Sequence, residues 1–126
     1  MSETKKKRVL VVDDQSKVLR FLEIDLKLRG FEVITTTSGE EALKLVESAQ
    51  PDIMLLDLVM PEVDGFDVLK RLRTFSKLPV IAFSASHGNY ETAISMGANE
   101  FVPKPFSSDD MVRRIHELTN HCNLAA

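Results

Sequence analysis

Residues 51–57 read PDIMLLD, a run of apolar residues that a proline introduces and an aspartate ends. The run predicts a strand over 52–56 with both faces buried, because a strand facing water on one side would alternate apolar and polar residues. Parallel strands that lie between two layers of helices have this pattern. Residues 51–57 therefore indicate an α/β protein in which helices cover both faces of the sheet.

The same pattern continues in both directions along the chain. Further strands are expected at 8–12, 31–35, 80–83 and around 101–102. Each is followed by a segment whose apolar residues recur at helical spacing. The alternation, without a linker, indicates one doubly wound (βα)5 domain over residues 1–126, with its core at about 8–120 and a mostly parallel sheet. Periodicity leaves the order of the strands open.

Local signals predict where the helices begin and end. Gly30 is expected at the C′ position of the first helix, and Ser38 with Glu41 forms a capping box for the second. Pro51 ends the second helix, and Ser107 or Ser108 caps the last. The residues expected on the apolar face of the first helix are Val18, Leu19, Leu22, Ile24, Leu26 and Leu28.

The composition excludes several classes of protein. The 126 residues are 44% hydrophobic and 28% charged, as in globular domains and unlike disordered chains. Cys122 is the single cysteine, so no internal disulfide can form and a reducing cytoplasm fits. The apolar runs are too short to cross a bilayer. The net charge of −3 argues against nucleic-acid binding by this chain alone, despite the basic run at 5–8. We expect a cytoplasmic protein.

Polar residues stand where the predicted strands end. Asp13 and Asp14 follow the first strand, and Asp57 follows the third. Ser84 ends the fourth strand, and Lys104 follows the fifth. In open α/β sheets, ligands bind beyond the carboxyl ends of the strands. These five side chains are therefore expected on one rim of the sheet.

Three carboxylates on one rim would repel one another unless a cation joins them. Their hard oxygen atoms favour Mg²⁺, for which Mn²⁺ can substitute. Plainer interpretations remain open: Asp13 and Asp14 could start a turn and cap a helix, and Asp57 could simply close a strand. Ser84 and Lys104 could each be solvated loop residues. The joint placement of these residues favours the metal site.

Four motifs stand at the strand ends. They read VLVVDD at 9–14, LLDLVMP at 55–61 followed by Asp64-Gly65, FSA at 83–85, and GANEFVPKPF at 97–106. Together they resemble the motifs of the receiver domain of two-component response regulators. The resemblance extends from Val9 to about Leu118. It implies a flavodoxin-like parallel sheet in the order 2-1-3-4-5, surrounded by five helices.

The resemblance also implies roles for the residues on the rim. Asp57 would be the nucleophile that accepts a phosphoryl group in a magnesium-dependent reaction. Asp14 and Asp57 would coordinate the ion directly, and Asp13 mainly through water. The backbone carbonyl of Val59 would be the remaining protein ligand. Lys104 would pair with a phosphoryl oxygen.

A switch follows from the same resemblance. Ser84 would donate a hydrogen bond to the phosphate and move inward, opening space for the ring of Phe101. The surface of the fourth helix, fifth strand and fifth helix would change as a result. The family more often has threonine at the position of Ser84 and often tyrosine at that of Phe101. Ser84 keeps the hydroxyl, whereas Phe101 has no phenolic oxygen with which to hydrogen-bond. The Lys104-Pro105 bond could be cis or trans.

The implied partner is a sensor histidine kinase or a histidine phosphotransfer protein in a phosphorelay. The chain would be a phosphoprotein that catalyses only its own phosphorylation and dephosphorylation. A phosphorylation-dependent homodimer stays open, with Asp110 and Arg114 as weak support. One rival is a haloacid-dehalogenase-like phosphatase, whose nucleophile is normally followed two residues later by an acid, where this chain has Val59. Another is a pseudo-receiver scaffold that never takes phosphate.

Overall fold

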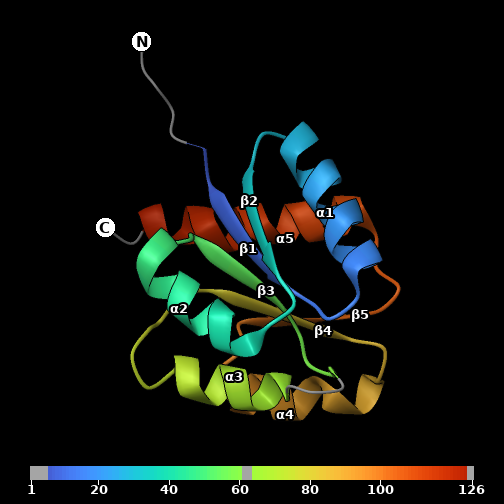
Figure 1. The fold of residues 1–126 in the computed structure, drawn as a ribbon, viewed down its shortest axis with the longest axis vertical. Helices are drawn as coiled ribbons and strands as arrows, with labels where there is room; N and C mark the ends of the chain where they lie inside the picture. Colours follow the sequence, from blue (N-terminus) through green and yellow to red (C-terminus); the bar gives the residue numbers. More distant parts are fainter. Residues whose placement is uncertain (1–5, 61–63, 125–126) are drawn as a thin grey trace.

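The computed structural model describes residues 6–60 and 64–124, with side chains up to Asn120 except that of His87. Sequence predictions that involve Lys5, Pro61 or the side chain of Cys122 lie outside the described residues. Strands and helices alternate along the described chain, as predicted (Figure 1). The strands are β1 Arg8–Val12, β2 Glu32–Thr36, β3 Ile53–Asp57, β4 Val80–Ser84 and β5 Glu100–Pro103. The helices are α1 Ser16–Leu28, α2 Gly39–Ala49, α3 Gly65–Leu72, α4 Tyr90–Ser95 and α5 Ser108–Leu124, and a 3₁₀ turn at His87–Asn89 precedes α4.

The strands form one parallel sheet in the order β2-β1-β3-β4-β5, which confirms the order implied by the family resemblance. β3 lies at the centre, and all five of its residues are buried, as its apolar run predicts. β2 and β3 each lie one residue further along the chain than expected. Asp57 is therefore the last residue of β3 and is held by the sheet itself.

Helices cover both faces of the sheet: α1 and α5 lie on one face, and α2, α3 and α4 on the other (Figure 1). Successive strand residues point into opposite layers. Val9 and Val11 pack in the cluster that contains α1 and α5. Leu10 and Val12 pack with α2, α3 and α4. The two layers of apolar side chains hold the carboxyl ends of the strands in fixed relative positions.

The prediction for α1 is wrong at two positions. Ile24 is 53% exposed and Leu28 is 83% exposed, whereas Leu19, Leu22 and Leu26 are buried. The buried residues follow one another at intervals of three and four, which keeps them on a single stripe of the helix. Ile24 and Leu28 fall outside that stripe, so α1 presents apolar side chains to the surface.

The predicted helix signals are confirmed in part. Gly30 has φ 97° after the end of α1, and the Ser38 hydroxyl caps α2 by accepting from the N–H of Glu41 at 3.1 Å. The second half of the capping box takes another form. The Ser38 N–H donates to the Thr36 hydroxyl at 3.0 Å, and that hydroxyl donates to the Glu41 carboxylate. At the start of α5, the Ser107 hydroxyl accepts from the N–H of Asp110 at 3.3 Å, so Ser107 acts as the cap.

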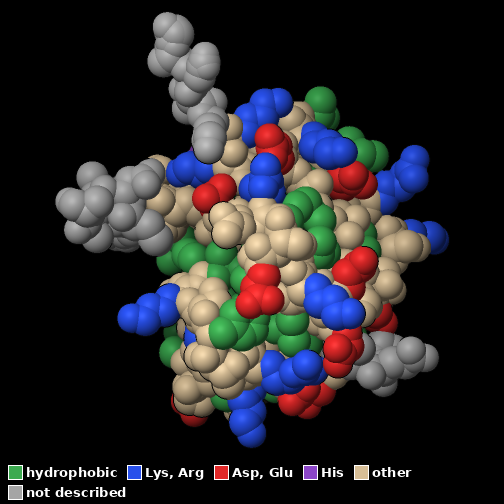
Figure 2. All heavy atoms as spheres, turned by 60° about the vertical axis from the view of Figure 1, so that its left-hand side comes forward, with side chains coloured by type: hydrophobic (Ala, Val, Ile, Leu, Met, Phe, Trp, Pro, Cys, Tyr) green, Lys and Arg blue, Asp and Glu red, His purple; other side chains and the backbone are tan. Residues whose placement is uncertain are grey.

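The described surface has a mixed charge. Acidic and basic side chains are interspersed over the face shown in Figure 2. Among the helices that the structure describes, none combines the length and the apolar character that crossing a bilayer requires. This agrees with the short apolar runs of the sequence.

Candidate functional site

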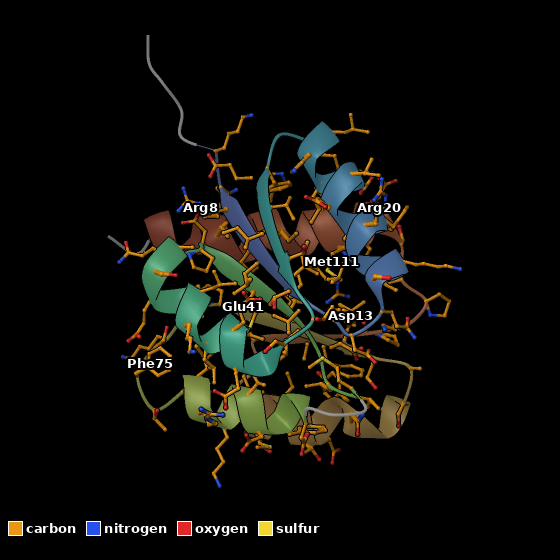
Figure 3. All side chains as sticks on the ribbon, viewed as in Figure 1. Arg8, Asp13, Arg20, Glu41, Phe75 and Met111 are labelled. Carbon is orange, nitrogen blue, oxygen red and sulfur yellow. The ribbon has the colours of Figure 1, made fainter. Side chains whose placement is uncertain are left out.

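The five polar residues predicted on one rim follow from the topology, because all five strands run parallel and their carboxyl ends share one edge. Asp13 lies at the end of β1 that is opposite to Arg8 (Figure 3). Asp57 and Ser84 end the neighbouring strands β3 and β4. Lys104 follows β5 directly and its backbone N–H donates to the Ser84 carbonyl at 2.9 Å.

Three carboxylates from this rim meet. Oxygen atoms of Asp13, Asp14 and Asp57 all lie within 4.8 Å of one another. Asp13 and Asp57 are buried, at 0% and 3% exposure, and Asp14 is partly exposed. Two backbone groups orient the buried pair: Gln15 N–H donates to Asp13 Oδ1 at 2.9 Å, and Val59 N–H donates to Asp57 Oδ1 at 3.1 Å. The strand ends and these backbone hydrogen bonds thus fix the position of the acidic triad, Asp13, Asp14 and Asp57.

Lys104 lies against two members of the triad. Its Nζ atom is 3.2 Å from Asp13 Oδ2 and 3.3 Å from Asp57 Oδ2. The same atom lies 5.1 Å from the centre of the Phe83 ring. The ammonium group therefore sits where a negatively charged group on Asp57 would meet it. The Lys104-Pro105 peptide bond that follows is cis.

Burial makes the ionised form of Asp57 costly. Desolvation is the largest cause that raises the pKa of Asp57, to about 6, and the negative charge of Asp13 raises it further. The Val59 N–H bond and the positive charge of Lys104 act in the opposite direction but do not cancel the effect. A second cation at the triad would favour the ionised carboxylate.

The donor set suits a hard divalent ion. Three carboxylates supply only oxygen ligands, and Asp14 keeps the site open to water, as Mg²⁺ and Mn²⁺ prefer. The Lys104 ammonium group pairs with two of the three carboxylates, so a further cation has negative charge to neutralise here. The triad could hold a metal ion. The assignment of the Val59 carbonyl as a further ligand stays a prediction.

The hydroxyl of Ser84 is buried and directed into the loop that follows β4. Its Oγ accepts from the backbone N–H of Ser86 and from Nδ2 of Asn89, both at 3.0 Å. Ser84 is 0% exposed. Ser84 therefore ends the strand next to the one that Asp57 ends, but both hydrogen bonds that its hydroxyl accepts come from the loop after β4.

Phe101 lies in the core, where it is 7% exposed. On β5 it pairs in register with Ala82 of β4. The ring of Tyr90, at the start of α4, packs edge-on against it with centroids 5.8 Å apart and an interplanar angle of 80°. The predicted switch aromatic thus contacts α4 already in this structure.

The sequence analysis assigned no role to two residues near the site, Gly65 and Asn89. A Cβ atom on Gly65 would lie 2.4 Å from the Asp57 carbonyl oxygen and 2.5 Å from the Leu58 Cα, so only glycine lets α3 begin this close to β3. The Asp64-Gly65 pair in the motif was the sequence signal that could have identified this glycine. Asn89 carried none, because its contact with Ser84 depends on how the loop folds back.

A model of the family described as "Response regulator receiver domain" matches residues 9–116. The transcriptional regulatory protein KdpE of Mycobacterium tuberculosis is 38% identical over 120 residues, which cover 94% of this chain and 53% of that protein. The alkaline phosphatase synthesis transcriptional regulatory protein PhoP of Bacillus subtilis is 33% identical over 123 residues, covering 95% of this chain and 51% of that protein. The chain spans about half the length of these curated relatives.

Solved structures agree with these sequence comparisons. The receiver domain of the Francisella response regulator 1452 superposes with a TM-score of 0.87 at 32% identity, covering 93% of this chain and 99% of that one. A CheY-like receiver domain protein from Methanospirillum hungatei gives a TM-score of 0.89 at 23% identity, covering 97% and 100%. The second likeness supports the fold alone.

Proposed function

This chain belongs to the response regulator receiver domain family of two-component systems, and from that premise we propose that Asp57 accepts a phosphoryl group from a phosphohistidine. Membership of this family implies a histidine kinase as partner. The donor would be the kinase itself or a histidine phosphotransfer protein. The observation that carries the proposal is the convergence of the three carboxylates of Asp13, Asp14 and Asp57 with the ammonium group of Lys104.

In the proposed reaction, a carboxylate oxygen of Asp57 attacks the phosphorus of the phosphohistidine. The new P–O bond forms an acyl phosphate, and the P–N bond breaks as the imidazole leaves with its electron pair. The Val59 N–H bond to Oδ1 and the sheet fix the direction of the attacking carboxylate. Lys104, already 3.3 Å from Asp57 Oδ2, would pair with an oxygen of the transferred phosphoryl group.

Asp13, Asp14 and Asp57, with the Val59 carbonyl, would hold Mg²⁺, or Mn²⁺ in its place. The ion supplies positive charge that neutralises the phosphoryl oxygens as they approach a carboxylate. Lys104 would supply the second positive charge beside Asp57. Asp14 is the most exposed member of the triad and marks the side on which the ion and the donor would enter.

Phosphorylation would switch the surface formed by α4, β5 and α5. The Ser84 hydroxyl would move away from its partners in the loop after β4 and donate to a phosphoryl oxygen, and Phe101 would change its contact with Tyr90. The chain would catalyse only its own phosphorylation and dephosphorylation. We further propose that residues 1–126 form a single cytoplasmic receiver unit with its core at about 8–120, that it does not bind nucleic acid by itself, and that phosphorylation could promote a homodimer.

The test is modification by a small donor. Purified protein is incubated with Mg²⁺ and acetyl phosphate, beside Asp57→Asn, and the mass of the intact chain is measured. Modification that requires both Mg²⁺ and Asp57 supports the receiver function. Labelling that survives in Asp57→Asn would overturn the assignment of the acceptor. Absence of any Mg²⁺-dependent modification would favour a scaffold, and sustained turnover of free phosphate esters would favour a phosphatase.

A further inference from the structure

Two consecutive residues at the start of α4 contact the two proposed switch residues. Asn89 Nδ2 donates to Ser84 Oγ at 3.0 Å, and the Tyr90 ring packs edge-on against Phe101. Ser84 ends β4 and Phe101 lies on β5, so the two contacts reach separate strands. The N-terminal end of α4 is thereby tied to both residues through which phosphorylation would act.

The side chain of Asn89 donates a hydrogen bond to Ser84 and does not cap its own helix. Asn89 is the N-cap residue of α4, a position where asparagine commonly accepts a hydrogen bond from a backbone N–H of the first turn. In this structure the side chain makes no such cap bond to α4. Its amide nitrogen is directed at Ser84 Oγ. Asn89, at the position where it could cap α4, thus donates its hydrogen bond to the Ser84 hydroxyl at the end of β4.

The hydroxyl of Ser84 is buried and bonded to the segment that follows β4. The residue is 0% exposed, and its Oγ accepts from Ser86 N–H and from Asn89, both at 3.0 Å. Both donors lie in the segment between β4 and α4. A hydroxyl can accept and donate at the same time, so the new bond alone does not exclude the bond to Asn89. In the proposed switch the Ser84 hydroxyl also moves inward, toward a phosphoryl oxygen on Asp57, and this movement would take it away from Asn89. The bond exists in the resting arrangement and would be absent in the switched one.

We propose that Asn89 is a positioning residue that holds Ser84 in its resting arrangement and so opposes the switch. The inference rests on the proposed function of Asp57 and Ser84. An interaction present in only one of two states shifts the equilibrium toward that state by its own free energy. A net hydrogen bond corresponds to a factor of roughly 2 to 10 in the equilibrium constant. Tyr90, through its contact with Phe101, connects the same end of α4 to the second switch residue.

The test measures binding of beryllofluoride, a phosphoryl mimic, to the full chain in the presence of Mg²⁺. We expect Asn89→Ala to bind roughly 2- to 10-fold more tightly than the parent chain, because the competing bond to Ser84 is gone. The matched control is Ser95→Ala on the same helix, whose exposed hydroxyl bonds only the Thr92 carbonyl among the contacts described. Its affinity should equal that of the parent.

A double-mutant cycle separates this role from a general effect on α4. In a Ser84→Ala background, Asn89→Ala should no longer change the affinity for beryllofluoride. The side-chain amide resonances of Asn89 in the parent chain give a readout that needs no variant. They should shift from hydrogen-bonded positions toward those of a free carboxamide when Mg²⁺ and beryllofluoride are added.

The outcomes are distinct. Equal or weaker binding by Asn89→Ala, an effect that persists without the Ser84 hydroxyl, or unmoved Asn89 amide resonances in a bound parent chain would each overturn the role of Asn89 while leaving the receiver function intact. A parent chain that does not bind beryllofluoride in a Mg²⁺- and Asp57-dependent manner would remove the proposed function and this inference together.

Discussion

Lys104 Nζ lies 3.3 Å from Asp57 Oδ2, so the proposed phosphoacceptor is paired with an ammonium group before any phosphate arrives. Lys104 follows β5 and Asp57 ends β3, with β4 between them in the sheet. The contact exists because three parallel strands end at one edge. A cation already placed beside the acceptor needs no large movement to meet a transferred phosphoryl group.

Replacement of that cation should separate metal binding from switching. We expect Lys104→Ala to bind Mg²⁺ at least as tightly as the parent, because a competing positive charge is removed from the triad. The spectral change that beryllofluoride induces should be strongly reduced, since one phosphoryl contact is lost. Mg²⁺ titration and amide NMR spectra measure the two effects. Lys70→Ala, at an exposed position of α3, is the control. A beryllofluoride-bound spectrum like that of the parent would contradict the role of Lys104.

The burial of Asp57 should be visible as a pH-dependent cost in stability. Because the pKa of Asp57 is raised to about 6 in the folded protein, the folded state binds more protons than the unfolded state between about pH 4 and about pH 6. The free energy of unfolding should therefore fall as the pH rises through this window, and the full cost is present above it.

Asp57→Asn removes this cost. With a chelator present, the variant should be more stable than the parent at neutral pH by on the order of 2 to 3 kcal/mol, and the difference should vanish toward pH 4. Urea unfolding of both chains at several pH values measures it. A difference that does not change with pH would show that another property of the amide is responsible.

Asp14 offers the cleanest test of the metal site, because it is the partly exposed member of the triad and the other two are buried. Mg²⁺ should raise the melting temperature of the parent with increasing concentration, as any ligand of the folded state does. We expect Asp14→Asn to need at least about tenfold more Mg²⁺ for the same stabilisation, since one charged ligand is gone. Glu47→Gln, which removes an equal charge from an exposed position of α2, should behave as the parent. Equal Mg²⁺ dependence in Asp14→Asn would exclude Asp14 as a ligand.

Gly65 should tolerate no side chain. A Cβ atom there would lie 2.4 Å from the Asp57 carbonyl oxygen and 2.5 Å from the Leu58 Cα. Both are backbone atoms, so the end of β3 or the start of α3 would have to move. We expect Gly65→Ala to lower the free energy of unfolding by at least about 2 kcal/mol and to weaken Mg²⁺ binding, because the end of β3 must shift. Gly88→Ala, whose Cβ would first meet Ser86 Oγ at 3.9 Å, is the matched control and should be close to neutral. Urea unfolding that shows equal stability for the two variants would contradict the close packing of α3 on β3.

The helical periodicity of the sequence predicted which segments form helices better than it predicted which residues those helices bury. In α1 the sequence analysis placed Ile24 and Leu28 on the apolar face of the helix, and both are exposed. Apolar residues four positions apart can lie on the same stripe and still face away from the sheet, because the rotation of a helix about its axis is fixed by packing. The capping residue Ser38 was predicted correctly, whereas the partner of Glu41 was not, since Thr36 reaches it from the preceding strand.

The sequence by itself determined the alternation of strands and helices, the central buried strand and the polar residues at the strand ends, because these depend on local periodicity and on short motifs. Only the tertiary structure decided that Lys104 Nζ pairs with both Asp13 and Asp57, and that Asn89 donates to the Ser84 hydroxyl. The first contact joins residues far apart in the chain. The second depends on the path of a loop. Such contacts arise when two layers of apolar side chains fix the strands side by side, and no local pattern encodes them.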